Sequence, residues 1–241
     1  MKISSIEYLI NRRTGKALHD YKMISDGDRI LVGVSGEDSL SLLNLLKMRL
    51  EYVPVKYKLI AAHVAINKKN AKVIENYLKK QGIEYYILKQ DLKNSKKGIK
   101  KTKCFFCSWK RREAIFKLAS RLRCKKIAFG HHLDDILETL LLNILFQAQI
   151  STMPPKLKMF KGRFHIIRPF SYLEKTHIEM YARLKKIPKL PYECPYGNIT
   201  KRALVRDVIK DLSKKIPHLK ENIFKSMSDI RKVYLPIKGI K

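Results

Sequence analysis

Three cysteines in this chain have the spacing of metal ligands. Cys104 and Cys107 are separated by two residues, and two thiolates at this spacing can bind one metal ion or cluster. Such a pair taken alone is typical of zinc or of a redox dithiol. A third thiolate favours an iron–sulfur cluster with one iron left open, and Cys194, in a loop rich in proline, is the candidate.

A short polar segment follows the first apolar run and has the composition of a phosphate-binding loop. It reads Ser35-Gly36-Glu37-Asp38-Ser39 and lies between an expected strand and an expected helix. Small residues let backbone N–H groups approach a phosphate, and a helix start adds partial positive charge. Asp38 is a suitable ligand for Mg²⁺. An ordinary helix cap has the same composition, so this segment alone does not decide between the two interpretations.

A third candidate segment runs from Gly130 to Asp135 and includes two histidines and two acids. It closes one expected strand and begins a helix. Acids at a helix start are favoured by the macrodipole, which is the structural interpretation. The functional interpretation is a turn beside a nucleotide, with an acid such as Asp134 that binds Mg²⁺ or transfers a proton.

The spacing of apolar residues predicts alternating strands and helices, and therefore an α/β, Rossmann-like parallel sheet with helices on both faces. In such sheets ligands bind beyond the carboxyl ends of the strands, where all three candidate segments are expected to meet. Strands are expected at 29–34, 57–66, 84–88, 126–129 and 164–168. Helices are expected at 3–20, 38–50, 70–81, 108–121, 133–146, 174–186 and from 201 onward, with a break near Pro217. Loops are expected at 89–103, which is rich in lysine, at 147–162 and at 187–200.

Composition points to a polyanionic partner. The chain has 241 residues, and 52 Lys and Arg against 21 Asp and Glu give a net charge of +31. Lysine-rich codon usage explains part of this excess but not the scarcity of acids, so we expect a nucleic-acid partner with salt-sensitive binding. The apolar runs are too short to span a membrane and no signal peptide is apparent, so we expect a cytoplasmic protein. We expect a single domain over 1–241, with a helical arm at 1–25 and a helical tail at 201–241.

The motifs resemble those of a known family. The segment at 35–39 is similar to the S-G-G-x-D-S loop of the PP-loop ATPases, although it is one residue shorter and carries Glu37. Residues 104–169, with C-x-x-C, G-H-H-x-D-D-I-L-E-T, M-P-P-K-L and I-R-P in order, resemble the tRNA-cytidine 2-sulfurtransferases, and the likeness covers roughly residues 20–230. The resemblance implies an adenine nucleotide alpha hydrolase-like fold and an enzyme that uses ATP and Mg²⁺. It also implies a [4Fe–4S] cluster on Cys104, Cys107 and Cys194.

The same resemblance implies roles for particular residues. ATP adenylates O2 of an anticodon-loop cytidine, and sulfur then replaces AMP at C2, with tRNA and a cysteine desulfurase or another sulfur donor as partners and a homodimer as an option. The implied catalytic residues are Asp38 and Asp134, and the implied RNA-binding residues are Lys110, Arg111 and Arg112. The implied nucleotide-binding residues are Ser35, Gly36, Asp38, Ser39, His63, Gly130 and His131.

Three alternatives stay open at this point. The shortened loop is also compatible with a PP-loop protein of weakened catalysis that acts as an RNA-binding module. A thiolase that acts on uridine is a second alternative, although such enzymes carry additional zinc-finger cysteines that this chain lacks. A lysidine-type PP-loop ligase is the third, and it would not need three cysteines.

Overall fold

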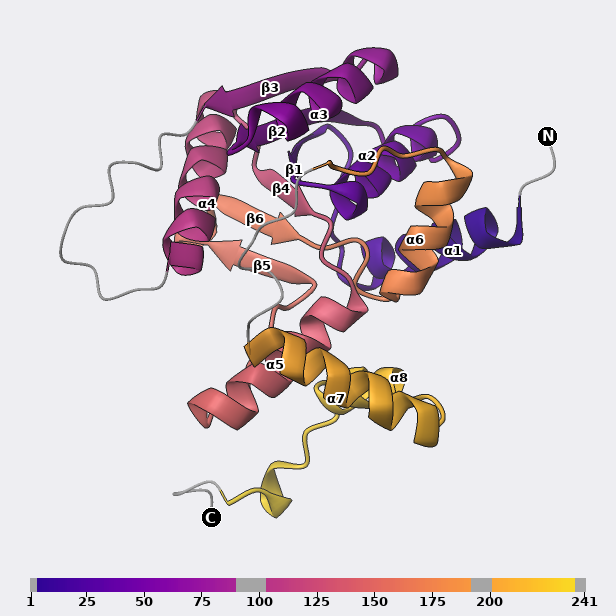
Figure 1. Cartoon of the computed structure of the whole chain (residues 1–241), viewed down its shortest axis with the longest axis vertical. Helices are drawn as coiled ribbons and strands as arrows, with labels where there is room; N and C mark the ends of the chain where they lie inside the picture. Colours follow the sequence, from indigo (N-terminus) through magenta and orange to yellow (C-terminus); the bar gives the residue numbers. More distant parts are fainter. Residues whose placement is uncertain (1–3, 90–102, 192–200, 237–241) are drawn as a thin grey trace. The chain divides into compact units, whose positions relative to one another are not determined.

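The structure is a computed structural model that describes residues 4–89, 103–191 and 201–236, with side chains from residue 107 onward in the second range. Its centre is a six-stranded sheet in the order β3-β2-β1-β4-β6-β5 (Figure 1). The strands are β1 (Asp28–Val34), β2 (Tyr57–Ala65), β3 (Glu84–Lys89), β4 (Lys126–Phe129), β5 (Lys156–Met159) and β6 (Phe164–Ile167). The five strands expected from the sequence are all present.

The sheet differs from the expected one at its edge. The pairs of β1 with β2, β1 with β4, β2 with β3 and β4 with β6 are parallel, but β5 runs antiparallel to β6. The expectation of a loop over 147–162 was therefore wrong at 156–159. This strand has four residues and alternates lysine with apolar residues, so its sequence signal is weak. Lysines on an edge strand also discourage pairing with another chain.

The chain forms two compact units. The first unit, Met1–His132 with Pro154–Asn198, contains the sheet, and the second is Leu133–Met153 with Ile199–Lys241. The expected single-domain organisation remains a prediction. Helices of the first unit are α1 (Ser5–Asp20), α2 (Glu37–Arg49), α3 (Lys68–Gln81), α4 (Lys103–Arg121) and α6 (Lys175–Leu184). Helices of the second are α5 (Leu133–Gln147), α7 (Lys201–Lys215) and α8 (Leu219–Ser226). Short 3₁₀ helices η1 (Phe160–Gly162) and η2 (Lys232–Tyr234) complete the set.

Both faces of the sheet are covered in the first unit. On one face, buried residues of α1, α2, α3 and α6 pack with Ile30, Val32 and Ala61 from the strands. On the other face, Ile115 and Leu118 of α4 pack against Leu31 and Ile127. Alternate residues of one strand thus face opposite layers, as the two-residue repeat of a strand requires.

Helix α4 begins earlier than its sequence indicates. We expected the cysteine pair to precede a helix at Ser108, but α4 starts at Lys103, so positions 104 and 107 lie one turn apart within it. Serine often begins helices, and cysteine and phenylalanine are weak helix formers, which made the expected start too late. In the second unit, α7 ends at Lys215 and α8 starts at Leu219, which confirms the expected break at Pro217.

The second unit has a small core of its own. Leu133 and Leu137 of α5 pack with Val205 and Ile209 of α7, and residues of α8 join them.

In the part of the chain that the structure describes, no helix combines the length and the apolar character needed to cross a bilayer.

Candidate functional site

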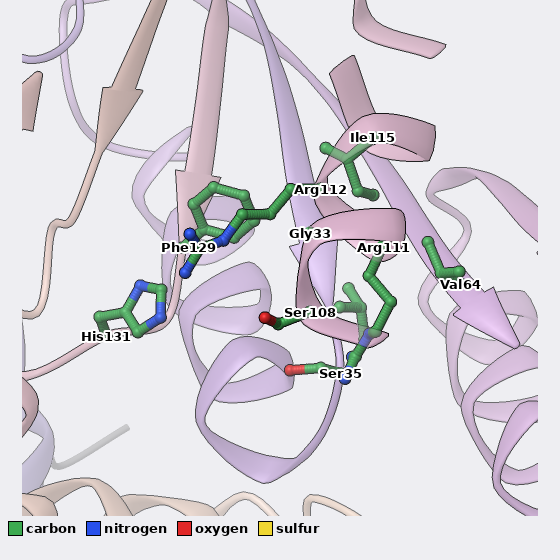
Figure 2. A pocket seen from close by; sticks show the side chains of 10 residues that line it. Gly33, Ser35, Val64, Ser108, Arg111, Arg112, Ile115, Phe129 and His131 are labelled. Atoms are coloured by element: carbon green, nitrogen blue, oxygen red, sulfur yellow. The ribbon is translucent and has the colours of Figure 1, made fainter. Parts of the chain in front are cut away.

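A pocket opens where the strand order changes direction. Strands β1 and β4 are neighbours, and β2 continues the sheet on one side while β6 continues it on the other. A crevice forms at such a switch point beyond the carboxyl ends of the strands. The pocket is lined by strand-end residues and by α4, namely Gly33, Val34, Ser35, Val64, Phe129, His131, Ser108, Arg111, Arg112 and Ile115. Figure 2 shows Ser35, Ser108 and Arg111 on one side of the pocket and His131 on the other.

The serine at the start of α2 organises the expected phosphate loop. The backbone N–H groups of Ser35 and Gly36 donate to Ser39 Oγ at 2.8 and 3.1 Å. Ser39 Oγ in turn donates to the carbonyl of Gly36 at 2.8 Å. The loop is thus closed on itself by one hydroxyl group, which occupies an acceptor position that a phosphate oxygen could take.

The two glycines predicted to bind the nucleotide, Gly36 and Gly130, differ in the space around them. A Cβ atom on Gly130 would lie 2.7 Å from the backbone nitrogen of Ser39, so the end of β4 and the start of α2 touch there. A Cβ on Gly36 would meet only Leu190, at 3.8 Å, and the φ of Gly36 is 174°, which any residue can adopt. Gly130 is therefore required by packing, whereas Gly36 leaves space open beside the loop.

Asp38 is ion-paired within the first unit. Its Oδ1 accepts a hydrogen bond from Lys175 Nζ at the start of α6, and its Oδ2 lies 3.9 Å from His132 Nε2. The carboxylate is about one-third exposed, whereas the His132 side chain is buried. Asp38 is thus held by a lysine that a metal ion or a phosphate would have to displace or share.

His63, at the end of β2, is a buried neutral histidine. Its Nδ1 lies 2.8 Å from the carbonyl of Val34, which fixes Nδ1 as the donor. Burial lowers the pKa of His63, and the positive charge of Arg111 lowers it further. The other ring nitrogen, Nε2, is a buried acceptor with no hydrogen-bond partner within the described residues, and His63 is not among the residues that line the pocket.

The basic residues after the cysteine pair separate into two groups. Arg111 and Arg112 line the pocket, together with Ser108. Lys110 points elsewhere, because its Nζ lies 3.2 Å from Glu113 and 5.0 Å from the centre of the Trp109 ring. Two of the three residues expected to bind RNA are thus brought to the same pocket as the phosphate loop.

The remaining predicted residues lie apart from this pocket or outside the described residues. Cys107 is half-buried on α4, next in sequence to the pocket residue Ser108. Position 104 lies one turn earlier on the same helix, and Cys194 falls outside the described residues. Asp134 belongs to the second unit, where Lys220 of α8 lies 2.7 Å from its Oδ1.

Several residues of this arrangement were not predicted from the sequence. Lys175, His132 and Ser108 were not singled out, and neither was Lys220. Lys175 did carry a signal, because a lysine at the first position of a helix opposes the macrodipole and needs a local reason. That reason is the carboxylate of Asp38. Lys220 carried no such signal.

The described side chains fit Mg²⁺ and a cluster only as parts of larger ligand sets. Among them, no group of three or more His, Cys, Asp or Glu residues is arranged to hold a metal. Mg²⁺ usually takes one or two carboxylates together with substrate phosphates, which suits Asp38 beside the loop. Cys107 has the thiol that a cluster needs, and position 104 has the spacing for a second ligand. The donor chemistry therefore fits both groups.

Comparisons with known proteins agree with the fold and identify the family. Residues 7–212 match the PP-loop domain family, so the pocket at the β1–β4 switch point belongs to a PP-loop protein. A tRNA-cytidine(32) 2-sulfurtransferase from Methylobacillus flagellatus is 38% identical over 92% of this chain and 76% of its own length. One from Polynucleobacter necessarius is 36% identical over 94% of this chain and 78% of its own length. The chain belongs to the tRNA-cytidine(32) 2-sulfurtransferase family.

A solved structure extends the agreement in fold. The U34-tRNA thiolase NcsA from Methanococcus maripaludis, determined with its [4Fe-4S] cluster, superposes with a TM-score of 0.78. The match covers 93% of this chain and 78% of that chain at 21% identity. An NH3-dependent NAD synthetase from Campylobacter jejuni matches with a TM-score of 0.53 at 16% identity over 94% of each chain. At these identities the likeness concerns the fold, which is the predicted adenine nucleotide alpha hydrolase-like arrangement.

Proposed function

We propose that this protein is an ATP-dependent tRNA sulfurtransferase that inserts sulfur at C2 of an anticodon-loop cytidine. The observation that carries the proposal is the shared pocket. The phosphate loop after β1, the turn after β4 and the helix that bears Cys107 all line or adjoin one opening. Membership of the sulfurtransferase family supports the choice of cytidine over uridine.

The pocket residues would bind ATP through its phosphates. Arg111 and Arg112 supply guanidinium groups that match phosphate oxygens, and the start of α2 adds backbone N–H groups. The cavity of about 170 Å³ is smaller than the roughly 300–1,000 Å³ of most small-molecule sites, so it suits the phosphates better than a whole nucleotide. Ser35 and His131 would contact the phosphates from opposite sides of the opening, and His63 would bind the nucleotide through Nε2.

Asp38 would bind Mg²⁺ together with phosphate oxygens. Lys175 now pairs with this carboxylate, and its ammonium group would pair with a phosphate instead when the metal binds. The exchange keeps each charge partnered, which avoids leaving a half-buried carboxylate alone. Asp134 would act as the second catalytic acid, with Lys220 as the residue that holds it in the resting protein.

Cys104, Cys107 and Cys194 would hold a [4Fe–4S] cluster. When bound, the cluster presents sulfur to the substrate at an iron without a protein ligand. The protein residues would position the target base, exclude water and stabilise the phosphates. O2 of the cytosine attacks the α-phosphorus of ATP and pyrophosphate leaves, and sulfur then adds at C2 with AMP as the leaving group.

The partners follow from the same proposal. The substrate is tRNA, the sulfur donor is a cysteine desulfurase or an equivalent protein, and the location is the cytoplasm, where thiols stay reduced for metal binding. A homodimer is also proposed. It is supported by a row of exposed apolar residues on α7, which are Leu204, Val208 and Leu212 at four-residue spacing.

Mass spectrometry of tRNA nucleosides from a deletion strain tests the proposal. We expect 2-thiocytidine to disappear and to return when the wild-type gene is supplied. Loss of a thiouridine instead would reassign the target base, and no change in thiolated nucleosides would overturn the proposal.

A non-catalytic RNA-binding role is the second candidate, and one observation favours it. Ser39 Oγ already accepts from the two loop N–H groups that a phosphate would use. Release of pyrophosphate from ATP by the cluster-loaded protein with unmodified tRNA separates the two functions. Binding of tRNA without any ATP binding would support the non-catalytic role.

A further inference from the structure

A strained hairpin tip projects from the edge of the sheet, away from the pocket. Strands β5 and β6 are joined by residues 160–163, of which Phe160, Lys161 and Gly162 have φ angles of 50°, 54° and 95°. Two consecutive non-glycine residues in the left-handed region are unusual, and for a bulky side chain such as phenylalanine this backbone is unfavourable. Backbone strain of this kind is retained where the surrounding structure requires it, often at functional positions.

Phe160 is held in place yet remains open to solvent. Its ring packs edge-on against Phe116 of α4 at 5.2 Å and against Phe164 of β6 at 6.1 Å between ring centres. The side chain is nevertheless 60% exposed. Arg163 fixes the hairpin to α4 from the other side, because its guanidinium donates to Ser120 Oγ at 2.8 Å. The tip therefore presents a positioned aromatic ring rather than burying it.

The surroundings of the ring are basic. Lys158, Lys161 and Arg163 are all exposed, and residues 139–173 contain no Asp or Glu. On the neighbouring strands, burial and the charges of Lys126, Lys156 and Lys158 lower the pKa of His165. The cations here are thus close enough to repel one another, which favours a polyanionic partner.

An exposed aromatic ring flanked by cations is the arrangement that binds unpaired nucleotides. Bases stack on such rings whatever their sequence, and the cations contact the phosphates on either side. We propose that Phe160, Lys158 and Lys161 bind an unpaired nucleotide of the tRNA substrate. The identity of the RNA rests on the proposed function.

The bound nucleotide would differ from the one that is modified. Strand β6 runs parallel to β4, and the tip precedes β6, so it lies at the amino-terminal end of these strands. The pocket lies at their carboxyl end. The tRNA would therefore contact both ends of the sheet on the side of α4, which lies beside β5 and β6 in Figure 1.

Binding of unmodified tRNA to the full-length, cluster-loaded protein tests the inference. We expect Phe160→Leu to weaken binding about tenfold without changing its salt dependence, since stacking releases no counterions. Phe160→Trp should retain the wild-type affinity. Lys161→Ala should reduce the slope of log affinity against log salt by about one. Lys72→Ala, at an exposed lysine of α3, is the matched control and should bind as wild type does.

Each outcome has one meaning. Wild-type affinity in both Phe160→Leu and Lys161→Ala, with tRNA binding intact, would overturn the inference and leave Phe160 as a packing residue. Absence of tRNA binding by the wild-type protein would instead overturn the proposed function. If Phe160→Leu fails to fold, Lys161→Ala decides the matter, because it changes only an exposed side chain.

Discussion

Arginines serve different purposes in the two units of this protein. In the first unit, Arg111 and Arg112 of α4 line a pocket beside the phosphate loop. In the second, Arg202 and Arg206 of α7 bind the buried carboxylate of Glu138, and Arg202 also lies 3.0 Å from Asp135. The difference shows that a basic residue next to a motif is not by itself a ligand site. In the second unit the fold supplies a buried carboxylate for both arginines.

One acid from each of the motifs S-G-E-D-S and G-H-H-x-D-D-I-L-E-T illustrates the same contrast. Asp38 in the first unit pairs with a lysine at the rim of the candidate site, whereas Glu138 in the second is almost fully buried between two arginines. Glu138 therefore contributes to stability, and Asp38 remains accessible for an exchange of partners.

Removal of the Glu138 carboxylate should have the largest effect. Glu138→Gln leaves Arg206 without its anionic partner and Arg202 with Asp135 alone, and we expect a loss of about 3 kcal/mol in unfolding free energy, since each hydrogen bond to a charged group contributes roughly 1.5–3 kcal/mol. Urea unfolding measures it. Asp211→Asn, which breaks the fully exposed pair with Lys214, is the control and should leave stability unchanged. Equal effects of the two variants would contradict the assignment of Glu138 to the core.

Substitutions of the two glycines of the site should have the next largest effects, and the two variants should differ in stability. In Gly130→Ala the new methyl group meets the backbone of Ser39, so we expect a loss of about 2 kcal/mol in stability together with loss of ATP binding. Gly36→Ala has room for its methyl group and should unfold as wild type does, while binding ATP less tightly because the methyl group lies beside the loop. Thermal unfolding and ATP titration of both variants check this. A destabilised Gly36→Ala would show that the loop needs glycine for its own conformation.

The arginines of the pocket should affect ligand affinity without affecting stability. Arg111→Ala and Arg112→Ala each remove a guanidinium, and we expect ATP affinity to fall about tenfold, which corresponds to roughly 1.4 kcal/mol for a charge-assisted contact. Lys110→Ala, one residue away but directed to Glu113, should keep the wild-type affinity. Isothermal titration with ATP and Mg²⁺ measures the three variants. If Lys110→Ala weakens ATP binding as much as Arg111→Ala, the separation of these residues into two groups is wrong.

The smallest expected effect is a pH dependence from His63. Burial holds the pKa of His63 below its ordinary value of 6.5, so the folded protein resists protonation that the unfolded chain accepts. Stability from this group is therefore fully present above pH 6.5 and declines as the pH falls below it. The unfolding free energy of His63→Gln, measured with urea, should decline less steeply from pH 7 to pH 5 than that of the wild type. An identical slope in both proteins would place the pH dependence elsewhere.

The sequence was informative where local chemistry and periodicity decide the structure. The five parallel strands and their crossover helices follow from short apolar runs separated by polar segments, and Ser35–Ser39 and Gly130–Asp135 were expected at the carboxyl ends of strands, where they lie. The prediction of secondary structure was less accurate where the sequence pattern was short or mixed. Strand β5 has two lysines among its four residues, and the start of α4 lacks residues that favour a helix.

The amino-acid sequence by itself determined the fold class, the family and the segments that carry the chemistry, because these depend on residue types and on spacing along the chain. Only the tertiary structure decided which side chains meet. It paired Lys175 with Asp38, directed Arg111 but not Lys110 into the pocket, and surrounded Glu138 with arginines from α7. Such pairings join residues far apart in the chain. They depend on how helices pack around a sheet, which no local pattern of residues encodes.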